Sequence, residues 1–332
     1  MPWASFIDSG SARLGGTTMK VKFWGTRGSI PTPISPLAIE DKVRRALRGA
    51  VGLDLSDEAA VERYIQRLPV TVRQTVGGNT ACVAVRAGSQ LLILDAGTGI
   101  RVLAYDLMKI EFGQGQGTAD ILISHTHWDH IQGWPFFVPA FVPGNRLTFS
   151  SPHSNLEAIL AGQQDETYFP VPLDDMRADL RFNRIPAETW TRLGEVCVYP
   201  LQMPHPGENY GYRIEYDDQV LVYASDSEYQ HMSPASTQAY VDFFRDADLL
   251  IFDAQYTLND ALDKADWGHS SPLMGAEFAH RAGVKRLALF HHDPLADDDA
   301  IYGALRQAET YISKRGCSCQ VLVAREGLEV AW

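Results

Sequence analysis

Three histidines and an aspartate fall within six consecutive residues, directly after an apolar run. Residues 125–130 read His-Thr-His-Trp-Asp-His, and imidazole nitrogens and carboxylate oxygens are donors that suit Zn²⁺, Mn²⁺ or Fe²⁺. Alternate residues of an extended segment face the same way, so His125 and His127 can share one ion. The chain must then turn, which lets Asp129 and His130 face a second ion. The spacing therefore favours a metal site over a polar loop that happens to hold histidines.

Further candidate ligands follow other apolar runs that are typical of strands. His205 comes after residues 199–204, Asp226 after 221–225 and His291 after 287–290. Each signal is weak alone, because a single histidine at a strand end is more often a hydrogen-bonded structural group. As an ordered set after residues 125–130 they are a strong signal. His292 competes with His291, which we prefer because it comes first after its strand.

This ordered set resembles the metallo-β-lactamase superfamily, over nearly all of residues 19–332 except 36–68. The resemblance implies an α/β (α+β) fold, a four-layer αββα sandwich with the metals at one edge of its two sheets. By motif it implies two ligand groups that share one residue: His125, His127 and His205 for the first ion, Asp129, His130 and His291 for the second, and Asp226 as the bridge. An aspartate rather than a cysteine at the bridge fits the phosphodiesterase and hydrolase branches.

A second region is similar to ribonuclease Z and the related small cyclic phosphodiesterases. Residues 266–271 resemble their His-Ser-Thr element, and 250–254 their His-Glu-Ala-Thr element, with Asp253 in place of glutamate. If these residues have the roles of the family's elements, His269 would stabilise the phosphate or protonate the leaving oxygen. Asp253 would orient the imidazole of His269 or favour its protonated, charged form. Without the resemblance, His269 reads as a loop histidine and Asp253 as a turn or helix-cap residue.

Two further residues lie in loops that resemble the same branch. Asp95 would be a carboxylate that orients a ligand histidine. Arg27 is the one basic residue that we place near a bound phosphate, where its planar guanidinium group would donate hydrogen bonds to the phosphate oxygens. A structural ion pair is an equal alternative for Arg27.

The resemblance implies a metal-dependent phosphodiesterase. Two divalent ions, with zinc as the default and Mn²⁺ or Fe²⁺ as alternatives, would lie about 3.5–4 Å apart and share a hydroxide that attacks phosphorus. Asp129 would position that hydroxide, and His269 would protonate the leaving oxygen. Three alternatives stay open: a carbon-centred metallo-hydrolase acting on a lactone, thioester or β-lactam, an RNA-processing endonuclease, and a non-catalytic metal-binding sensory module.

Composition bears on the substrate. Acidic residues outnumber basic ones by 41 to 29, which gives a formal charge of −12, whereas a long nucleic acid needs many Lys and Arg contacts. The sequence shows no long, basic, Gly/Pro-rich arm of the kind by which ribonuclease Z proteins hold tRNA. Aromatic residues cluster at 128–141 and 168–169, and one or two can stack on a nucleobase, although core or subunit contacts are the more ordinary interpretation. We therefore expect a small phosphodiester, first of all a cyclic nucleotide.

The elements that must position these residues are mixed along the chain. Strands are predicted at 21–24, 81–86, 91–94, 121–124, 147–150, 196–201, 212–216, 220–224, 249–252, 287–290 and 320–324. Helices are predicted at 99–109, 155–162, 237–246, 272–282 and 298–314. This mixture favours sheets covered by helices over an all-β sandwich.

The ends and additions of the domain can also be predicted. Residues 1–18 are Gly/Ser-rich without an apolar signal core, so we expect a disordered leader before a hydrolase domain at 19–332. Residues 36–68 carry two helical stretches and are interpreted as an insertion, which would be a lid, a dimer contact or a surface elaboration without a role. A homodimer is common in the branch that this chain resembles.

Cysteine usage and hydropathy indicate the compartment. The four cysteines do not make a disulfide framework in a chain of 332 residues, so we interpret them as free thiols in a reducing compartment. No run approaches the roughly 18 apolar residues that a membrane span requires. We therefore expect a cytoplasmic protein without a membrane partner.

Overall fold

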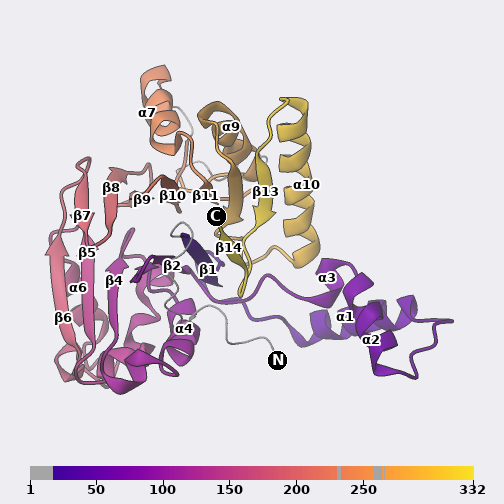
Figure 1. Ribbon diagram of the computed structural model, residues 1–332, viewed down its shortest axis with the longest axis horizontal. Helices are drawn as coiled ribbons and strands as arrows, with labels where there is room; N and C mark the ends of the chain where they lie inside the picture. Colours follow the sequence, from indigo (N-terminus) through magenta and orange to yellow (C-terminus); the bar gives the residue numbers. More distant parts are fainter. Residues whose placement is uncertain (1–17, 230–232, 258–263, 265) are drawn as a thin grey trace.

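The computed structural model describes residues 18–229, 233–257, 264 and 266–332. The predicted leader thus lies outside the described residues, except for Thr18. Two seven-stranded sheets pack face to face, and helices cover their outer faces (Figure 1). The predicted four-layer α/β (α+β) sandwich is confirmed.

The first sheet contains most of the amino-terminal half of the chain. Its strand order is β14 (Glu329–Ala331), β1 (Lys20–Gly25), β2 (Cys82–Ala87), β3 (Gln90–Leu94), β4 (Thr118–Leu122), β5 (Arg146–Ser151) and β6 (Asp179–Arg184). Strands β3 to β6 run parallel, so their carboxyl ends meet at one edge of the sheet. The loop that contains residues 125–130 begins at this edge.

The second sheet is built from the carboxyl-terminal half. Its order is β13 (Gln320–Val323), β12 (Arg286–Phe290), β11 (Leu249–Asp253), β10 (Gln219–Ala224), β9 (Tyr210–Tyr216), β8 (Val196–Gln202) and β7 (Thr191–Leu193). Strands β10 to β13 run parallel, whereas β7 to β10 form an antiparallel meander. The ends of β10, β11 and β12 therefore lie side by side.

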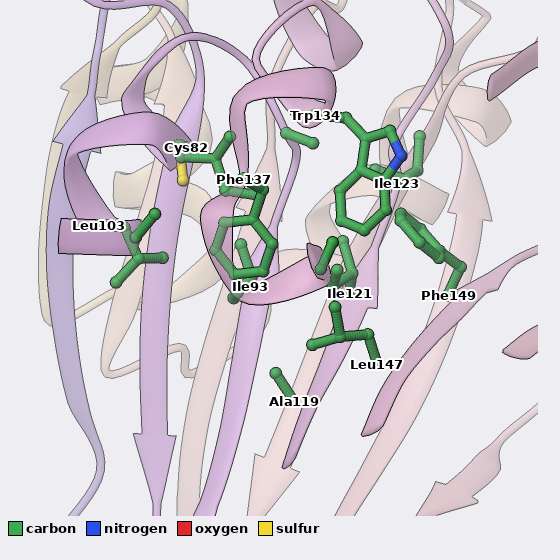
Figure 2. Packing of buried hydrophobic residues seen from close by; sticks show 14 of the residues in the cluster. Cys82, Ile93, Leu103, Ala119, Ile121, Ile123, Trp134, Phe137, Leu147 and Phe149 are labelled. Carbon is green, nitrogen blue, oxygen red and sulfur yellow. The ribbon is translucent and has the colours of Figure 1, made fainter. Parts of the chain in front are cut away.

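Successive side chains along a strand face opposite sides of the sheet, and the buried apolar residues therefore form three layers. In β3, Leu92 and Leu94 face the second sheet, while Leu91 and Ile93 face the outer helices. The outer layer of the first sheet packs against α4 (Gly99–Leu107), α6 (Leu156–Gln163) and the short helices Trp134–Phe136 and Val138–Phe141 (Figure 2). The outer layer of the second sheet packs against α7 (Pro234–Phe244), α9 (Pro272–Ala282) and α10 (Asp298–Lys314).

Two helices occupy the segment that was interpreted as an insertion. Helix α1 (Pro36–Gly49) has Ser35 as its N-cap, and α2 (Glu58–Arg67) has Asp57. A short helix, α3 (Val70–Arg73), leads back to β2. Neither α1 nor α2 contains a buried residue, and both project beside the sheets (Figure 1). The interpretation as an insertion, and the roles of lid or dimer contact, stay predictions.

Strand β4 differs from its predicted position at 121–124. It begins at Thr118 and ends at Leu122, because the main-chain N–H of Ser124 donates to the carboxylate of Asp95 at 2.7 Å. The main-chain N–H of Asp95 in turn donates to Leu122 O at 3.0 Å. Residues 123–127 are thereby released from the sheet and are free to present side chains at its edge.

Three strands and several short helices were not predicted from the sequence. Strands β6, β7 and β14 lie at sheet edges, and β6 carries charged side chains on exposed positions. The remaining short helices are α5 (Trp128–Ile131) and the 3-10 turns Glu111–Gln114 and Leu173–Asp175. Among the described residues, no helix is long and apolar enough to span a membrane. All four cysteines are free thiols.

The aromatic core of the first sheet gives a stability prediction. Phe149 is fully buried, stacks on Phe182 at 5.0 Å and meets Trp134 edge-on at 4.7 Å between ring centroids. We expect Phe149→Ala to lower the free energy of unfolding by about 3–5 kcal/mol, because it removes buried surface and leaves a cavity. Urea denaturation measures the change. Tyr168→Ala, at a side chain that is 79% exposed, is the control and should change it by less than about 0.5 kcal/mol. Equal effects of the two variants would contradict the packing described.

Candidate metal centre

The seven predicted ligands come from both sheets and meet at one edge. Residues 125–130 follow β4, and the other three ligands follow β8, β10 and β12. Their donor atoms form two groups, within each of which all atoms lie within 4.8 Å of one another. The three-histidine group contains His125, His127 and His205, and the buried group contains Asp129, His130, Asp226 and His291.

The three-histidine group is open to solvent on one side. Nδ1 of His127 lies 3.0 Å from Nε2 of His125 and 3.1 Å from Nε2 of His205. His125 is buried, His205 is half-buried and His127 is exposed. Burial lowers the pKa of all three imidazoles, so each ring is neutral near pH 7 and offers a lone pair to a cation.

The buried group concentrates negative charge. Nε2 of His291 lies 3.1 Å from a carboxylate oxygen of Asp129 and 3.2 Å from one of Asp226. Burial opposes the ionised form of Asp129, yet His130 and His291 hold its pKa well below the usual value. Burial likewise opposes protonation of His130, but the neighbouring carboxylates outweigh burial and raise its pKa well above the usual value. The group therefore has a strong preference for a positive charge.

Asp226 lies between the two groups. Its Oδ2 is 3.7 Å from Nε2 of His125, while its Oδ1 is 3.1 Å from Nε2 of His130 and 3.2 Å from Nε2 of His291. One oxygen thus faces each group, which is the arrangement that a bridging carboxylate requires. The donor types and their spacing fit divalent metal ions.

The structure distinguishes between the two adjacent histidines after β12. His291 enters the buried group, whereas Nε2 of His292 pairs with the main-chain oxygen of Ala324 at 2.8 Å. Burial lowers the pKa of His292 to about 3. The preference for His291 over His292 therefore agrees with the placement of the two side chains.

Asp95 holds His130 from behind. Its Oδ2 pairs with Nδ1 of His130 at 2.7 Å and accepts from the hydroxyl of Tyr223 at 2.7 Å. All three side chains are fully buried. Because Nδ1 is engaged, Nε2 of His130 is directed into the buried group, as expected for a carboxylate that orients a ligand.

Left-handed backbone conformations mark the turns that present the site. In the described part of the chain, eight residues other than glycine have positive φ, and four belong to the site: Ser29, Asp95, Asp226 and His291. Such conformations are unfavourable for side chains with a Cβ and persist only where contacts hold them. Asn209 supplies such contacts, because its Nδ2 donates to the main-chain oxygens of Ser225 and Asp226. The turn after β10 is therefore fixed from a neighbouring loop.

His269 and Asp253 form a hydrogen-bonded pair beside the buried group. Nδ1 of His269 lies 2.9 Å from Oδ2 of Asp253, and the His269 ring stacks on that of His291 at 5.1 Å. Burial opposes protonation of His269, but the charge and hydrogen bond of Asp253 outweigh it and raise the pKa to about 9. The arrangement leaves Nε2 of His269 available to an external group.

Arg27 makes contacts of a structural kind. Its Nε donates to Gly77 O at 3.0 Å, and its Nη1 donates to the main-chain oxygens of Asp293 and Ala296 at 2.9 and 2.8 Å. These bonds tie three loops together and fit the structural alternative, although their acceptors are main-chain oxygens rather than a carboxylate. A contact between Arg27 and a phosphate stays a prediction.

Three residues at the site had no role assigned from the sequence. The main-chain N–H of Ser29 donates to Oδ2 of Asp129 at 2.7 Å, and Tyr223 and Asn209 act as described above. The loop that contains Arg27 was recognised as similar to the branch, but a main-chain donor leaves no signal in side-chain type. Tyr223 lies in a buried strand, where its hydroxyl needs a hydrogen-bond partner. A tyrosine in such an apolar run could therefore have indicated a buried polar contact.

The aromatic cluster divides into two parts in the structure. Trp134 and Phe137 are buried in the outer core of the first sheet (Figure 2). Trp128, Phe136 and Tyr168 are 79%, 52% and 79% exposed. Trp128 directly follows His127 in the chain, and its side chain is exposed.

Comparisons with known proteins agree with the fold. Residues 91–292, more than half of the chain, match the family described as the Beta-lactamase superfamily domain. A Ribonuclease Z from Halobacterium salinarum is 26% identical over 304 residues, covering 76% of this chain and 92% of that protein. The metallo-β-lactamase fold protein YhfI from Bacillus subtilis superposes with a TM-score of 0.62 at 19% identity, covering 96% and 100% of the two chains. A diphosphatase of the PhnP family superposes with a TM-score of 0.56 at 17% identity, covering 95% and 97%.

The contact between Asp95 and His130 gives a prediction for metal affinity. We expect Asp95→Asn to weaken zinc binding by about 10- to 100-fold, because an amide no longer fixes the ring with a charged acceptor. Competition with a chromophoric chelator measures the dissociation constant. Asp248→Asn is the matched control, since Asp248 binds Val220 N and Lys285 away from the two groups. Unchanged zinc affinity in Asp95→Asn would contradict the orienting role.

Proposed function

The chain belongs to the metallo-β-lactamase superfamily and is a metal-dependent hydrolase, and from this premise we propose a binuclear phosphodiesterase that hydrolyses a small phosphodiester. A cyclic nucleotide is the substrate that we place first. The observation that carries the proposal is the pair of His269 and Asp253, whose 2.9 Å hydrogen bond lies beside the buried group. A proton donor at this position would serve a reaction in which the leaving oxygen must be protonated before it departs.

The two ligand groups support a pair of ions. Two divalent ions, with zinc as the default, would lower the pKa of a shared water and offset charge on the phosphoryl group. The three-histidine group would hold one of them and the buried group the other, with Asp226 between them. Mn²⁺ and Fe²⁺ suit the same donor types.

The roles of the protein side chains follow from their contacts. Asp129 accepts the main-chain N–H of Ser29 at 2.7 Å, so its carboxylate has a fixed direction from which to orient the attacking water. His269 donates a proton from Nε2 to the departing oxygen, while Asp253 retains Nδ1. A lactone or thioester hydrolase would give these two residues no clear task.

The direction of approach follows from burial. All four members of the buried group are shielded, whereas His127 is exposed and His205 is half-buried. The substrate therefore approaches over the three-histidine group. Trp128 is next to His127 in the chain, and its exposed ring offers a surface on which a nucleobase can stack.

RNA processing is a second candidate, which the likeness to the Halobacterium Ribonuclease Z favours. The formal charge of −12 speaks against it, because long nucleic acids bind through many cationic contacts to phosphates. Cleavage of a precursor tRNA under conditions where cyclic nucleotides are untouched would establish this alternative. We give priority to the small substrate for this electrostatic reason.

The acid role of His269 predicts a dependence on the leaving group. We expect His269→Ala to lower kcat on a cyclic nucleotide by about 10²–10⁴-fold, because the ribose alkoxide needs a proton to depart. The loss on bis-p-nitrophenyl phosphate should be much smaller, since nitrophenolate departs without one. Steady-state kinetics on the two substrates measures the difference. His280→Ala, on α9, is the control for loss of an imidazole. Equal losses on both substrates would rule out proton donation by His269.

Metal removal tests the proposal as a whole. We expect a chelator to abolish phosphodiester hydrolysis and added Zn²⁺ or Mn²⁺ to restore it, whereas Ca²⁺ should fail because it prefers oxygen ligands. Initial rates on a panel of phosphodiesters, a lactone, a thioester and a β-lactam give the comparison. Turnover confined to the carbon esters or the lactam would favour the carbon-centred alternative. A metal-loaded protein that is inert on the whole panel would favour the sensory module.

A further inference from the structure

The ligand histidines differ in what holds the ring nitrogen that faces away from the metal groups. Nδ1 of His125 lies 3.1 Å from Ser124 Oγ, that of His130 lies 2.7 Å from Asp95, and that of His205 lies 2.8 Å from Gly268 O. His291 differs from these three: its Nδ1 is buried and has no hydrogen-bond partner among the described residues. Metal-binding histidines almost always donate this proton, so a partner is expected.

Gln255 carries a matching unpaired acceptor. Its side-chain Oε1 is also buried without a partner in the described part of the chain. Its Nε2 donates to Ser29 Oγ at 3.3 Å, and its main-chain N–H donates to Asp253 Oδ1 at 3.0 Å. The residue thus lies between the loop that holds Asp129 and the carboxylate that holds His269.

Gly28 shows that the unpaired donor and acceptor face the same small space. A Cβ built on Gly28 would lie 2.4 Å from Nδ1 of His291 and 2.6 Å from Oε1 of Gln255. The main-chain N–H of Gly28 also donates to His292 O at 3.0 Å, which holds this loop against the turn after β12. A side chain larger than that of glycine at position 28 would therefore collide with both the ring and the amide.

We propose that Gln255 is the positioning residue of His291. Its Oε1 accepts the Nδ1–H of the imidazole and so selects the tautomer whose Nε2 lone pair faces the buried group. The same amide holds Ser29 through Nε2, and the N–H of Ser29 holds Asp129 at 2.7 Å. Gln255, which follows the end of β11, therefore orients two ligands, His291 and Asp129. This inference rests on the proposed pair of ions.

Two substitutions separate positioning from packing. Gln255→Leu keeps the volume and removes the acceptor, so we expect it to weaken one ion by about 10- to 100-fold and leave the other unchanged. Gln255→Glu restores an acceptor and should restore the affinity. Gln164→Leu is the matched control, because Gln164 also has a buried Oε1 without a partner among the residues that the structure describes, and an Nε2 bonded to a main-chain oxygen. Stepwise zinc titration against a chromophoric chelator gives both dissociation constants.

A spectroscopic readout reports the tautomer directly. Long-range ¹H–¹⁵N spectra of the histidine rings should show His291 as the Nδ1–H form, with its Nδ1 signal displaced in Gln255→Leu and recovered in Gln255→Glu. Equal weakening of both ions, no greater effect than in Gln164→Leu, or no recovery in Gln255→Glu would overturn the inference. A wild-type protein that binds no pair of ions would overturn the proposed function together with it, whereas two ions in wild type and unchanged affinities in Gln255→Leu would overturn the inference alone.

Discussion

The buried carboxylate of Asp95 is the interaction on which the site depends. It follows β3 of the first sheet, accepts from Tyr223 of β10 in the second, and holds both Ser124 and His130. A buried charge is costly unless its hydrogen bonds are satisfied, so every partner of Asp95 is needed. The contact therefore fixes how the sheets meet, where β4 ends and which way a ligand points. The placement of the donors is a property of the packed sheets as well as of the loop that carries them.

Charge and exposure give the two ligand groups different characters. The buried group combines two carboxylates with two imidazoles and is closed to solvent, while the three-histidine group is neutral and open. The pair of His269 and Asp253 lies beside the buried group. In the proposed reaction, a phosphodiester that enters over the open group would place its leaving oxygen towards this pair. The structure thus places residues of similar type in different surroundings.

The sequence predicted the parts that depend on local pattern. Strands buried on both faces, such as β3 and β11, were found because their apolar runs are uninterrupted, whereas the exposed edge strand β6 has no such run. The ligands at 125–130 were visible from their spacing, but the distant ones relied on the likeness to a family. Gln255 and Ser29 escaped notice as a pair because they are 226 positions apart in the chain, and only the folded sheets bring them together. The end of β4 was misplaced because a side chain, not the ladder, takes up the N–H of Ser124.

The left-handed turns at Asp95, Asp226 and His291 have a consequence for how this protein can change. Each turn stores backbone strain that glycine would relieve, and glycine would also delete the side chain that the turn exists to present. At Asp226 and His291, glycine would relax the backbone at the expense of the chemistry, whereas at Asp95 it would also remove the hydrogen bonds that join the two sheets.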